Sequence, residues 1–194
     1  MPLKIVFMGT PEFSIPTLDI LKKSKFNILT AYTQPPQKSK RGQKIHSSAI
    51  EDYCKKNGIN FRNPPSLSGE EEFDNFKELF PDVVVVVSYG QIIPKNFLKI
   101  AKFGFINIHA SLLPKWRGAA PIQRAIMNGD KKIGVSIMKI EEQLDSGPVL
   151  TSNELELDQN ATHGEIEKKL SIMGAKLLIK SLKTIEIGNP KFID

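Results

Sequence analysis

Val83–Val87 is an unbroken run of five valines, and it narrows the choice of fold more than any other segment of the chain. A short, continuous run of β-branched residues is typical of a central parallel strand that is covered on both faces. A membrane-spanning helix needs about 20 apolar residues, so the run is far too short to cross a bilayer. The run therefore predicts a buried strand at the centre of a sheet.

Strand-like and helix-like patterns alternate on either side of this run. We expect further strands at residues 4–8, 27–33, near 61, 105–109, 133–140 and 149–157. We expect helices after Thr10, which can cap the first of them, and at residues 47–57, 69–79, 94–100, 121–128 and 162–182. Residues 34–43 contain two prolines and a glycine without apolar periodicity, so we expect a loop there.

This alternation indicates an α/β protein with a doubly wound, mostly parallel sheet. The two late strands are expected to pair as a short antiparallel C-terminal addition. A chain of 194 residues can bury one well-filled core, and we expect one domain over residues 1–188. The sequence Ile-Gly-Asn-Pro at 187–190 looks like the beginning of a linker, so residues 189–194 are expected to lie in it.

The charge of the chain favours an anionic partner. Lysine and arginine exceed aspartate and glutamate by six, and the isoelectric point is about 9.3. Four basic residues, Lys38, Lys40, Arg41 and Lys44, lie within a stretch of seven residues, in the basic loop that we expect from Gln34 to Lys44. Such a cluster can bind phosphates in a salt-dependent way, but a run of charges is also common in a loop that is merely solvated.

Several classes of protein are disfavoured by what the sequence lacks. The single cysteine, Cys54, cannot form an internal disulfide or a cysteine-based zinc site. The three histidines do not have the spacing of metal ligands, so we expect no metal. The turn after the first strand lacks the glycine patterns that hold NAD or ATP. No signal peptide is visible at the N-terminus, so we expect a cytoplasmic protein.

Three polar residues are candidates for catalysis. Asn107 and His109 leave the same face of the expected strand 105–109, near its carboxyl end, where open α/β sheets place their active sites. Asp145 follows in the sequence Leu-Asp-Ser-Gly, between the two late strands. Taken alone, Asn107 and His109 also suit the polar end of a strand, with a histidine whose hydrogen bonds are made within the protein. Asp145 also suits an ordinary turn.

Taken together, these motifs resemble the family of formyltransferases that use 10-formyltetrahydrofolate. That family carries an Asn-x-His pair, a Ser-Leu-Leu-Pro segment and a later Asp-x-Gly turn. Here they are Asn107 and His109, residues 111–114, and Asp145 with Gly147. Residues 8–13, 87–94 and 116–124 are similar to the branch that acts on methionyl-tRNA, and the resemblance covers essentially all of the chain.

Two departures from that family are visible. Gln143 stands where the family has glycine. The full transferases of this branch also carry a C-terminal β-barrel that helps to hold tRNA, and no segment here corresponds to it.

The resemblance implies an activity, two substrates and a set of contact residues. The activity is transfer of a formyl group from 10-formyltetrahydrofolate to the α-amino group of methionyl-initiator tRNA, giving N-formylmethionyl-tRNA for translation initiation. Contacts with the folate are implied for Ser88, Tyr89, Gly90, Gln91, Ile92, Ser111, Leu112, Leu113 and Pro114. Contacts with the tRNA are implied for Lys40, Arg41, Gly42, Lys44, Trp116 and Arg117. We expect the protein to act as a monomer, away from membranes.

The three candidate residues suit this chemistry. Amine attack on a formyl carbon places negative charge on the former carbonyl oxygen, and a preorganised donor there can stabilise the transition state by roughly 3–4 kcal/mol. Asn107 is a neutral donor, His109 can donate or pass a proton, and Asp145 can orient and charge the imidazole. The amine itself attacks, so no enzyme nucleophile is required.

Two other functions fit parts of the pattern. A formyltransferase acting on nucleotide-linked amino sugars would use the same three residues, although residues 116–124 argue against it. A folate- or RNA-binding module without turnover would explain the missing barrel, although the intact set of Asn107, His109 and Asp145 argues against that.

Overall fold

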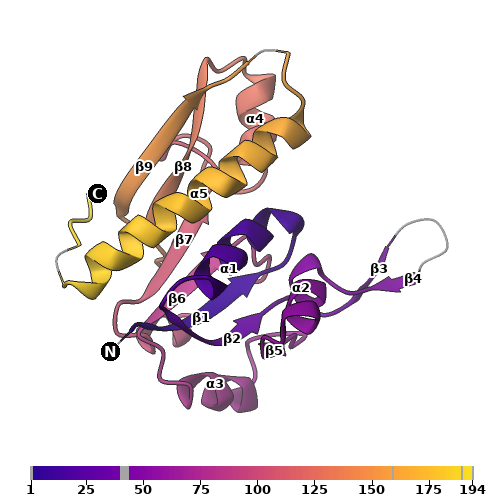
Figure 1. The fold of residues 1–194 in the computed structure, drawn as a ribbon, viewed down its shortest axis with the longest axis vertical. Coiled ribbons are helices and arrows are strands. Elements are labelled where there is room, and N and C mark those ends of the chain that lie inside the picture. Colours follow the sequence, from indigo (N-terminus) through magenta and orange to yellow (C-terminus); the bar gives the residue numbers. More distant parts are fainter. Residues whose placement is uncertain (1, 40–43, 159, 189, 194) are drawn as a thin grey trace. The chain divides into compact units, whose positions relative to one another are not determined.

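The structure is a computed structural model that describes residues 2–39, 44–158, 160–188 and 190–193 (Figure 1). The chain forms two compact units. The first comprises residues 1–15 and 24–105, and the second comprises residues 16–23 and 106–194. No helix in the described residues is long and apolar enough to span a bilayer.

The first unit is built on parallel strands. Its strands are β1 (Lys4–Gly9), β2 (Asn27–Tyr32), β5 (Phe61–Arg62) and β6 (Val83–Val87), in the order β5-β2-β1-β6. All three neighbouring pairs are parallel, and Met8 lies beside Val86 in the β1–β6 pair. All five valines of β6 are buried. Because successive side chains point to opposite faces, the strand is covered on both, as the sequence predicts.

Four helical segments complete the first unit. They are η1 (Glu12–Ser14), α2 (Ala49–Asn57), α3 (Glu70–Lys77) and η2 (Phe97–Lys99). The Ser48 side chain caps α2 by accepting a hydrogen bond from the Glu51 amide, and Gly58 ends it in the left-handed conformation. In the core, the ring of Phe76 lies 5.3 Å from that of Tyr32 and 5.1 Å from that of Phe97, so α3 is anchored by aromatic packing.

Two expectations for the first unit were wrong. Part of the expected loop is a hairpin, in which β3 (Gln37–Ser39) pairs antiparallel with β4 (Lys44–His46). These strands are held by backbone hydrogen bonds, and their mostly polar side chains leave no apolar pattern to read. Thr10 is not a helix cap, because its hydroxyl donates to the Tyr89 carbonyl oxygen at 2.7 Å. Pro11 precedes η1 instead, without a side-chain cap.

The second unit combines antiparallel strands with helices. Its strands are β7 (Phe105–His109), β8 (Lys132–Lys139) and β9 (Val149–Glu156), in the order β7-β8-β9. Both pairs are antiparallel, so the expected C-terminal addition is confirmed. Its helices are α1 (Ile15–Lys22), α4 (Pro121–Met127) and α5 (His163–Glu186).

The long helix α5 packs along β8 and β9 (Figure 1). Thr162 and Glu165 form a reciprocal capping box at its start. Gly174 allows a close approach to the sheet, because a Cβ atom there would lie 2.7 Å from Cγ2 of Ile108. Ile108 stands between Asn107 and His109, so this contact supports the strand that carries the candidate site.

Candidate active site

Strand β7 presents Asn107 and His109 on one face, two residues apart. His109 is 6% exposed and sits opposite Ser136 of β8, whereas Asn107 is partly exposed. Among the hydrogen bonds of the described residues, none involves the Asn107 side chain. The amide therefore has donors to offer to a bound molecule.

The imidazole of His109 lies between two acceptors. Its Nε2 atom is 2.9 Å from the carbonyl oxygen of Trp116, and its Nδ1 atom is 3.6 Å from Oδ2 of Asp145. The first distance is that of a hydrogen bond, while the second is too long for one and suits an ion pair. Only a protonated imidazole has a donor for each neighbour. The Asp145 carboxylate therefore faces the Nδ1 edge of the ring, while the Trp116 carbonyl holds the Nε2 edge.

Asp145 is held by the backbone of a second loop. Its Oδ2 atom accepts a hydrogen bond from the Gly118 amide at 2.8 Å, and its side chain is 13% exposed. Its φ angle of 47° lies in the left-handed region, which aspartate enters more readily than most residues. The sharp turn directs the carboxylate toward His109, although the two are 36 residues apart in sequence.

A hydroxyl network fixes the segment that follows β7. Ser136 donates to the carbonyl oxygen of Ser111 at 2.8 Å and accepts from the Leu113 amide at 3.1 Å. Ser111 in turn donates to the Lys115 carbonyl oxygen at 2.5 Å. Because Ser136 is also the cross-strand partner of His109, β8 supports both the histidine and the segment after it.

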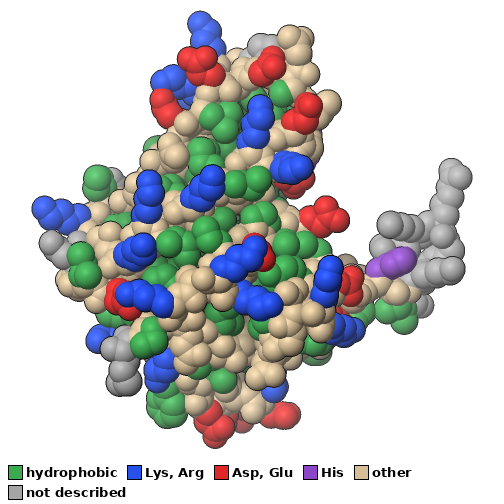
Figure 2. Space-filling model, in the orientation of Figure 1, with side chains coloured by type: hydrophobic (Ala, Val, Ile, Leu, Met, Phe, Trp, Pro, Cys, Tyr) green, Lys and Arg blue, Asp and Glu red, His purple; other side chains and the backbone are tan. Residues whose placement is uncertain are grey.

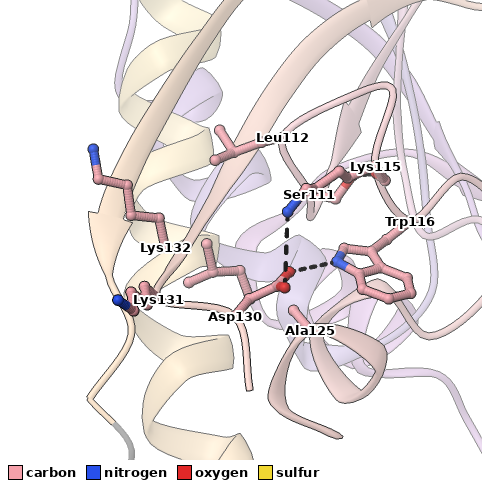
Figure 3. A pocket seen from close by; sticks show the side chains of 9 residues that line it. Ser111, Leu112, Lys115, Trp116, Ala125, Asp130, Lys131 and Lys132 are labelled. Atoms are coloured by element: carbon pink, nitrogen blue, oxygen red, sulfur yellow. Dashed lines mark hydrogen bonds and ion pairs between the residues drawn. The ribbon is translucent and has the colours of Figure 1, made fainter. Parts of the chain in front are cut away.

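Trp116 is anchored by its side chain to Asp130 (Figure 3). The indole Nε1 donates to Asp130 Oδ2 at 2.7 Å, and the Asn128 amide donates to Oδ1 at 2.8 Å. These two hydrogen bonds, led by that of the indole, hold the pKa of the Asp130 carboxyl below its usual range. Asp130 is thus a buried anion with side-chain donors arranged around it.

A pocket of about 450 Å³ opens beside this anchor (Figure 3). Its wall is formed by Leu112, Trp116, Ala125 and Ile133, with Lys115, Lys131 and Lys132 among the remaining lining residues. None of Asn107, His109 and Asp145 lines it. The pocket therefore lies next to the candidate catalytic group without including it.

The residues predicted to contact folate are divided between the units. Residues 111–114 belong to the second unit, together with Asn107, His109 and Asp145, while residues 88–92 belong to the first. Ser88 and Gly90 have positive φ angles, and the ring of Tyr89 is buried, where it packs as part of the core. Burial raises the pKa of the Tyr89 phenol. Ile92 is 92% exposed, so its side chain is free of the core.

The residues predicted to contact tRNA are only partly described. Lys40, Arg41 and Gly42 lie outside the described residues, and Lys44 begins β4. Arg117 is exposed, while Trp116 is half-buried through its contact with Asp130. On the face shown in Figure 2, lysine and arginine side chains are spread over the surface and do not form one dense patch.

The sequence did not point to three members of this group. They are the Trp116 carbonyl, the Gly118 amide and the Asp130 carboxylate. Two of them are backbone groups, which every residue type except proline supplies in full. Asp130 follows Asn128 and Gly129 in what reads as an ordinary turn, and nothing in the sequence ties it to Trp116. Among the described residues, no group of three His, Cys, Asp or Glu side chains is placed to hold a metal ion.

The sequence matches a known family over most of its length. Residues 3–182 fit the family model described as formyl transferase. The chain belongs to the formyl transferase family. Asn107, His109 and Asp145 all lie within the matched residues.

Among members of the formyl transferase family, proteins named methionyl-tRNA formyltransferase are similar to the chain. The protein from Pelagibacter ubique is 50% identical over 186 residues, which are 95% of this chain and 60% of that protein. A protein of the same name from Coxiella burnetii is 46% identical over 191 residues, which are 98% of this chain and 61% of that protein. The chain thus spans about 60% of the length of the curated relatives it matches.

Solved structures show the same fold. Phosphoribosylglycinamide formyltransferase from Bacillus halodurans superposes with a TM-score of 0.76, covering 94% of each chain at 20% identity. This likeness confirms the Rossmann-like formyltransferase fold that the sequence predicts. It says nothing of the substrate, because the two sequences are so different.

Proposed function

We propose that the chain transfers a formyl group from 10-formyltetrahydrofolate to the α-amino group of methionine on initiator tRNA. The product, N-formylmethionyl-tRNA, serves translation initiation, which places the protein in the cytoplasm. The observation that carries the proposal is the distance of 3.6 Å between His109 Nδ1 and Asp145 Oδ2. His109 lies on β7, the strand that also carries Asn107. The relatives at 45–50% identity, all named methionyl-tRNA formyltransferase, support the acceptor.

The reaction needs one new bond, one broken bond and one proton movement. The amine lone pair forms a C–N bond with the formyl carbon, and the carbonyl electrons move onto the oxygen. When they return, the bond from that carbon to the folate nitrogen breaks. The folate nitrogen gains a proton, and the former amine loses one.

Asn107 has the property required of a donor to the developing oxyanion. Its amide is neutral, is partly exposed and makes no hydrogen bond among the described residues. A donor that is fixed before the reaction needs little reorganisation during it, and its loss costs about 100- to 1,000-fold in turnover in comparable sites.

His109 and Asp145 are suited to the proton movement. Because Nε2 of His109 is held by the Trp116 carbonyl, the ring edge beside Asp145 is the one where a proton can be taken up or released. The Asp145 carboxyl group lies close to that edge, and the Gly118 amide holds its Oδ2 atom there. The carboxylate can then stabilise the imidazolium that general acid catalysis requires.

The substrate contacts in this proposal follow the sequence. The folate would lie against residues 88–92 and 111–114, where backbone polar groups could match those of a pterin ring. The tRNA would meet Lys40, Arg41, Gly42, Lys44, Trp116 and Arg117. Residues 1–188 would form the catalytic domain and act as a monomer. No metal has a role in the reaction as written.

The decisive experiment is an acceptor assay with 10-formyltetrahydrofolate as donor. Methionyl-initiator tRNA, free methionine and a nucleotide-linked amino sugar are each offered to the purified protein. We expect formylation of the methionyl-tRNA alone, detected as N-formylmethionine after the ester is hydrolysed. Formylation of the amino sugar instead would overturn the proposed acceptor, and no formylation of any acceptor would overturn the proposed activity.

A further inference from the structure

Two backbone groups of the segment 116–118 hold the His109–Asp145 pair, one on each partner. The Trp116 carbonyl accepts from Nε2 of His109 at 2.9 Å. The Gly118 amide donates to Oδ2 of Asp145 at 2.8 Å. Any movement of this short segment would therefore shift both the imidazole and the carboxylate.

The conformation of this segment is not one that the chain adopts by default. Trp116 has a φ angle of 57° and Gly118 one of 88°, both in the left-handed region. For a bulky residue such as tryptophan this region is unfavourable, so contacts elsewhere must hold it there. Ala120 has a φ angle of 56° as well, which shows that the unusual backbone extends to the start of α4.

Side-chain packing around the indole is incomplete. Trp116 is half-buried, and its ring lines the open pocket of about 450 Å³ (Figure 3). Since there is room beside the ring, its position depends strongly on the 2.7 Å hydrogen bond from Nε1 to Asp130. Asp130 is 9% exposed and is itself fixed by the Asn128 amide at 2.8 Å.

We propose that Trp116 and Asp130 are positioning residues, which set the geometry of the His109–Asp145 pair through the backbone of residues 116–118. The catalytic consequence rests on the function proposed above, while the geometric statement does not. Asp130 anchors the indole, the indole fixes the left-handed backbone, and the carbonyl and amide of that backbone orient the two candidate catalytic side chains.

The first test reads the imidazole of His109 directly by nitrogen NMR. The chain has three histidines, and His46 and His163 are surface residues that serve as internal references. In Trp116→Phe, which keeps an aromatic ring but removes the N–H donor, we expect the Nε2 resonance of His109 to move. The resonances of His46 and His163 should stay unchanged. A His109 resonance that also stays unchanged would overturn the proposal.

A graded series at Asp130 separates positioning from general damage. Asp130→Asn retains an oxygen that can accept from the indole, whereas Asp130→Ala removes it. We expect the His109 resonance to move more in Asp130→Ala than in Asp130→Asn. Glu154→Gln, an exposed carboxylate on β9, is the matched control and should leave it in place. Equal effects of Asp130→Ala and Glu154→Gln, together with an unperturbed Trp116→Phe, would contradict the proposal.

Turnover supplies the second readout. Asp130 has no assigned substrate contact, so Asp130→Ala should lower kcat by about 10- to 100-fold with little change in KM, as small misplacements of catalytic groups do. Asp130→Asn should recover part of the loss. Circular dichroism checks that each variant is folded, because Trp116→Phe removes the single tryptophan and with it the fluorescence signal. Should Asp130→Ala fail to fold, Trp116→Phe and Asp130→Asn carry the test.

The two proposals fail in different ways. A moved His109 resonance in a protein that formylates no acceptor would refute the proposed function and leave the positioning intact. An active protein in which both Trp116→Phe and Asp130→Ala leave the His109 resonance and kcat unchanged would refute the positioning alone.

Discussion

Asn107 and Asp145 differ in how their side chains are held, and this difference separates their roles. The side-chain amide of Asn107 makes no hydrogen bond among the described residues. The Asp145 carboxylate accepts a hydrogen bond from the Gly118 backbone amide and faces His109. A substitution at Asn107 therefore removes a group that the fold does not use. A substitution at Asp145 removes a group that also supports a loop.

Replacing Asn107 by Ala should lower kcat by about 100- to 1,000-fold, because the proposed donor to the oxyanion is lost. Asn107→Asp should be at least as damaging, since a carboxylate would repel the developing charge. The melting temperature of both variants should stay close to that of the wild type. Steady-state kinetics with methionyl-tRNA and a thermal melt test this, and near-normal kcat in Asn107→Ala would remove the residue from the mechanism.

At Asp145, the variants Asp145→Asn and Asp145→Ala distinguish charge from support. Asn keeps an oxygen that can accept from the Gly118 amide at its present 2.8 Å, but it loses the charge beside His109. We expect both to lose turnover by about 100-fold or more, because neither stabilises an imidazolium. Only Asp145→Ala should also lower the melting temperature. Full activity in Asp145→Asn would show that the charge is not needed.

The difference between side-chain groups and backbone groups explains which parts of the candidate site could be predicted from the sequence. Asn107, His109 and Asp145 stand out because the proposed chemistry depends on their side chains. The Trp116 carbonyl and the Gly118 amide act through the backbone, and their direction depends on positive φ angles. Glycine at 118 permits such an angle, but tryptophan at 116 gives no sign of one. The partnership of Trp116 with Asp130 depends on how α4 and its following turn fold back.

Among the elements, α5 and β7 meet at Gly174, where the helix approaches the strand that carries Asn107 and His109. Sequence periodicity predicts the helix well, since apolar residues recur on one side. It does not reveal that a glycine in mid-helix allows a close approach to the strand. The β3–β4 hairpin was missed for the opposite reason, because backbone pairing of polar residues leaves no periodic signal.

Gly174→Ala should therefore destabilise the protein, although alanine is the better helix former by about 1 kcal/mol. The new Cβ would lie 2.7 Å from Cγ2 of Ile108, which is too close and attached to a stiff branched side chain. We expect a net loss of about 1–3 kcal/mol in the free energy of unfolding.

The matched control for this prediction is Gly164→Ala in the same helix, where a Cβ meets nothing within 4 Å. It should be neutral or stabilising, by up to about 1 kcal/mol. Urea unfolding of both variants gives the comparison. If Gly174→Ala proved as stable as Gly164→Ala, α5 would not be in tight contact with β7.

For the whole molecule, the fold class could be predicted because the order of apolar and polar residues in the sequence reflects which residues are buried. The five valines of β6 are all buried, and the late strands do pair antiparallel. The chain organises this fold as two compact units, and the sequence gives no sign of the division. The boundary falls within β7, between Phe105 and Ile106, in a segment that reads as one uninterrupted strand.

The response of the whole protein to alkaline pH follows from three buried acids that hold their protons in the folded state. Burial raises the pKa of Cys54 to about 11, with a smaller contribution from the charge of Glu51. Burial also raises the pKa of Tyr32 and of Tyr89, and the Glu72 carboxylate adds to both shifts. In the unfolded chain, thiols and phenols ionise near their ordinary values of about 8.5 and 10.

Above those values the unfolded state loses protons that the native state retains, so unfolding becomes more favourable as the pH rises. The stability that these groups contribute should be complete below about pH 8 and should decline through pH 9–11, by up to about 1.4 kcal/mol per pH unit for each group. Urea unfolding at a series of pH values, followed by circular dichroism, measures the slope. Cys54→Ala, which lacks one of the three groups, should decline less steeply than the wild type. A stability that stays level up to pH 11 would mean that these side chains ionise as readily in the folded protein as in the unfolded chain, and hence that water reaches them there.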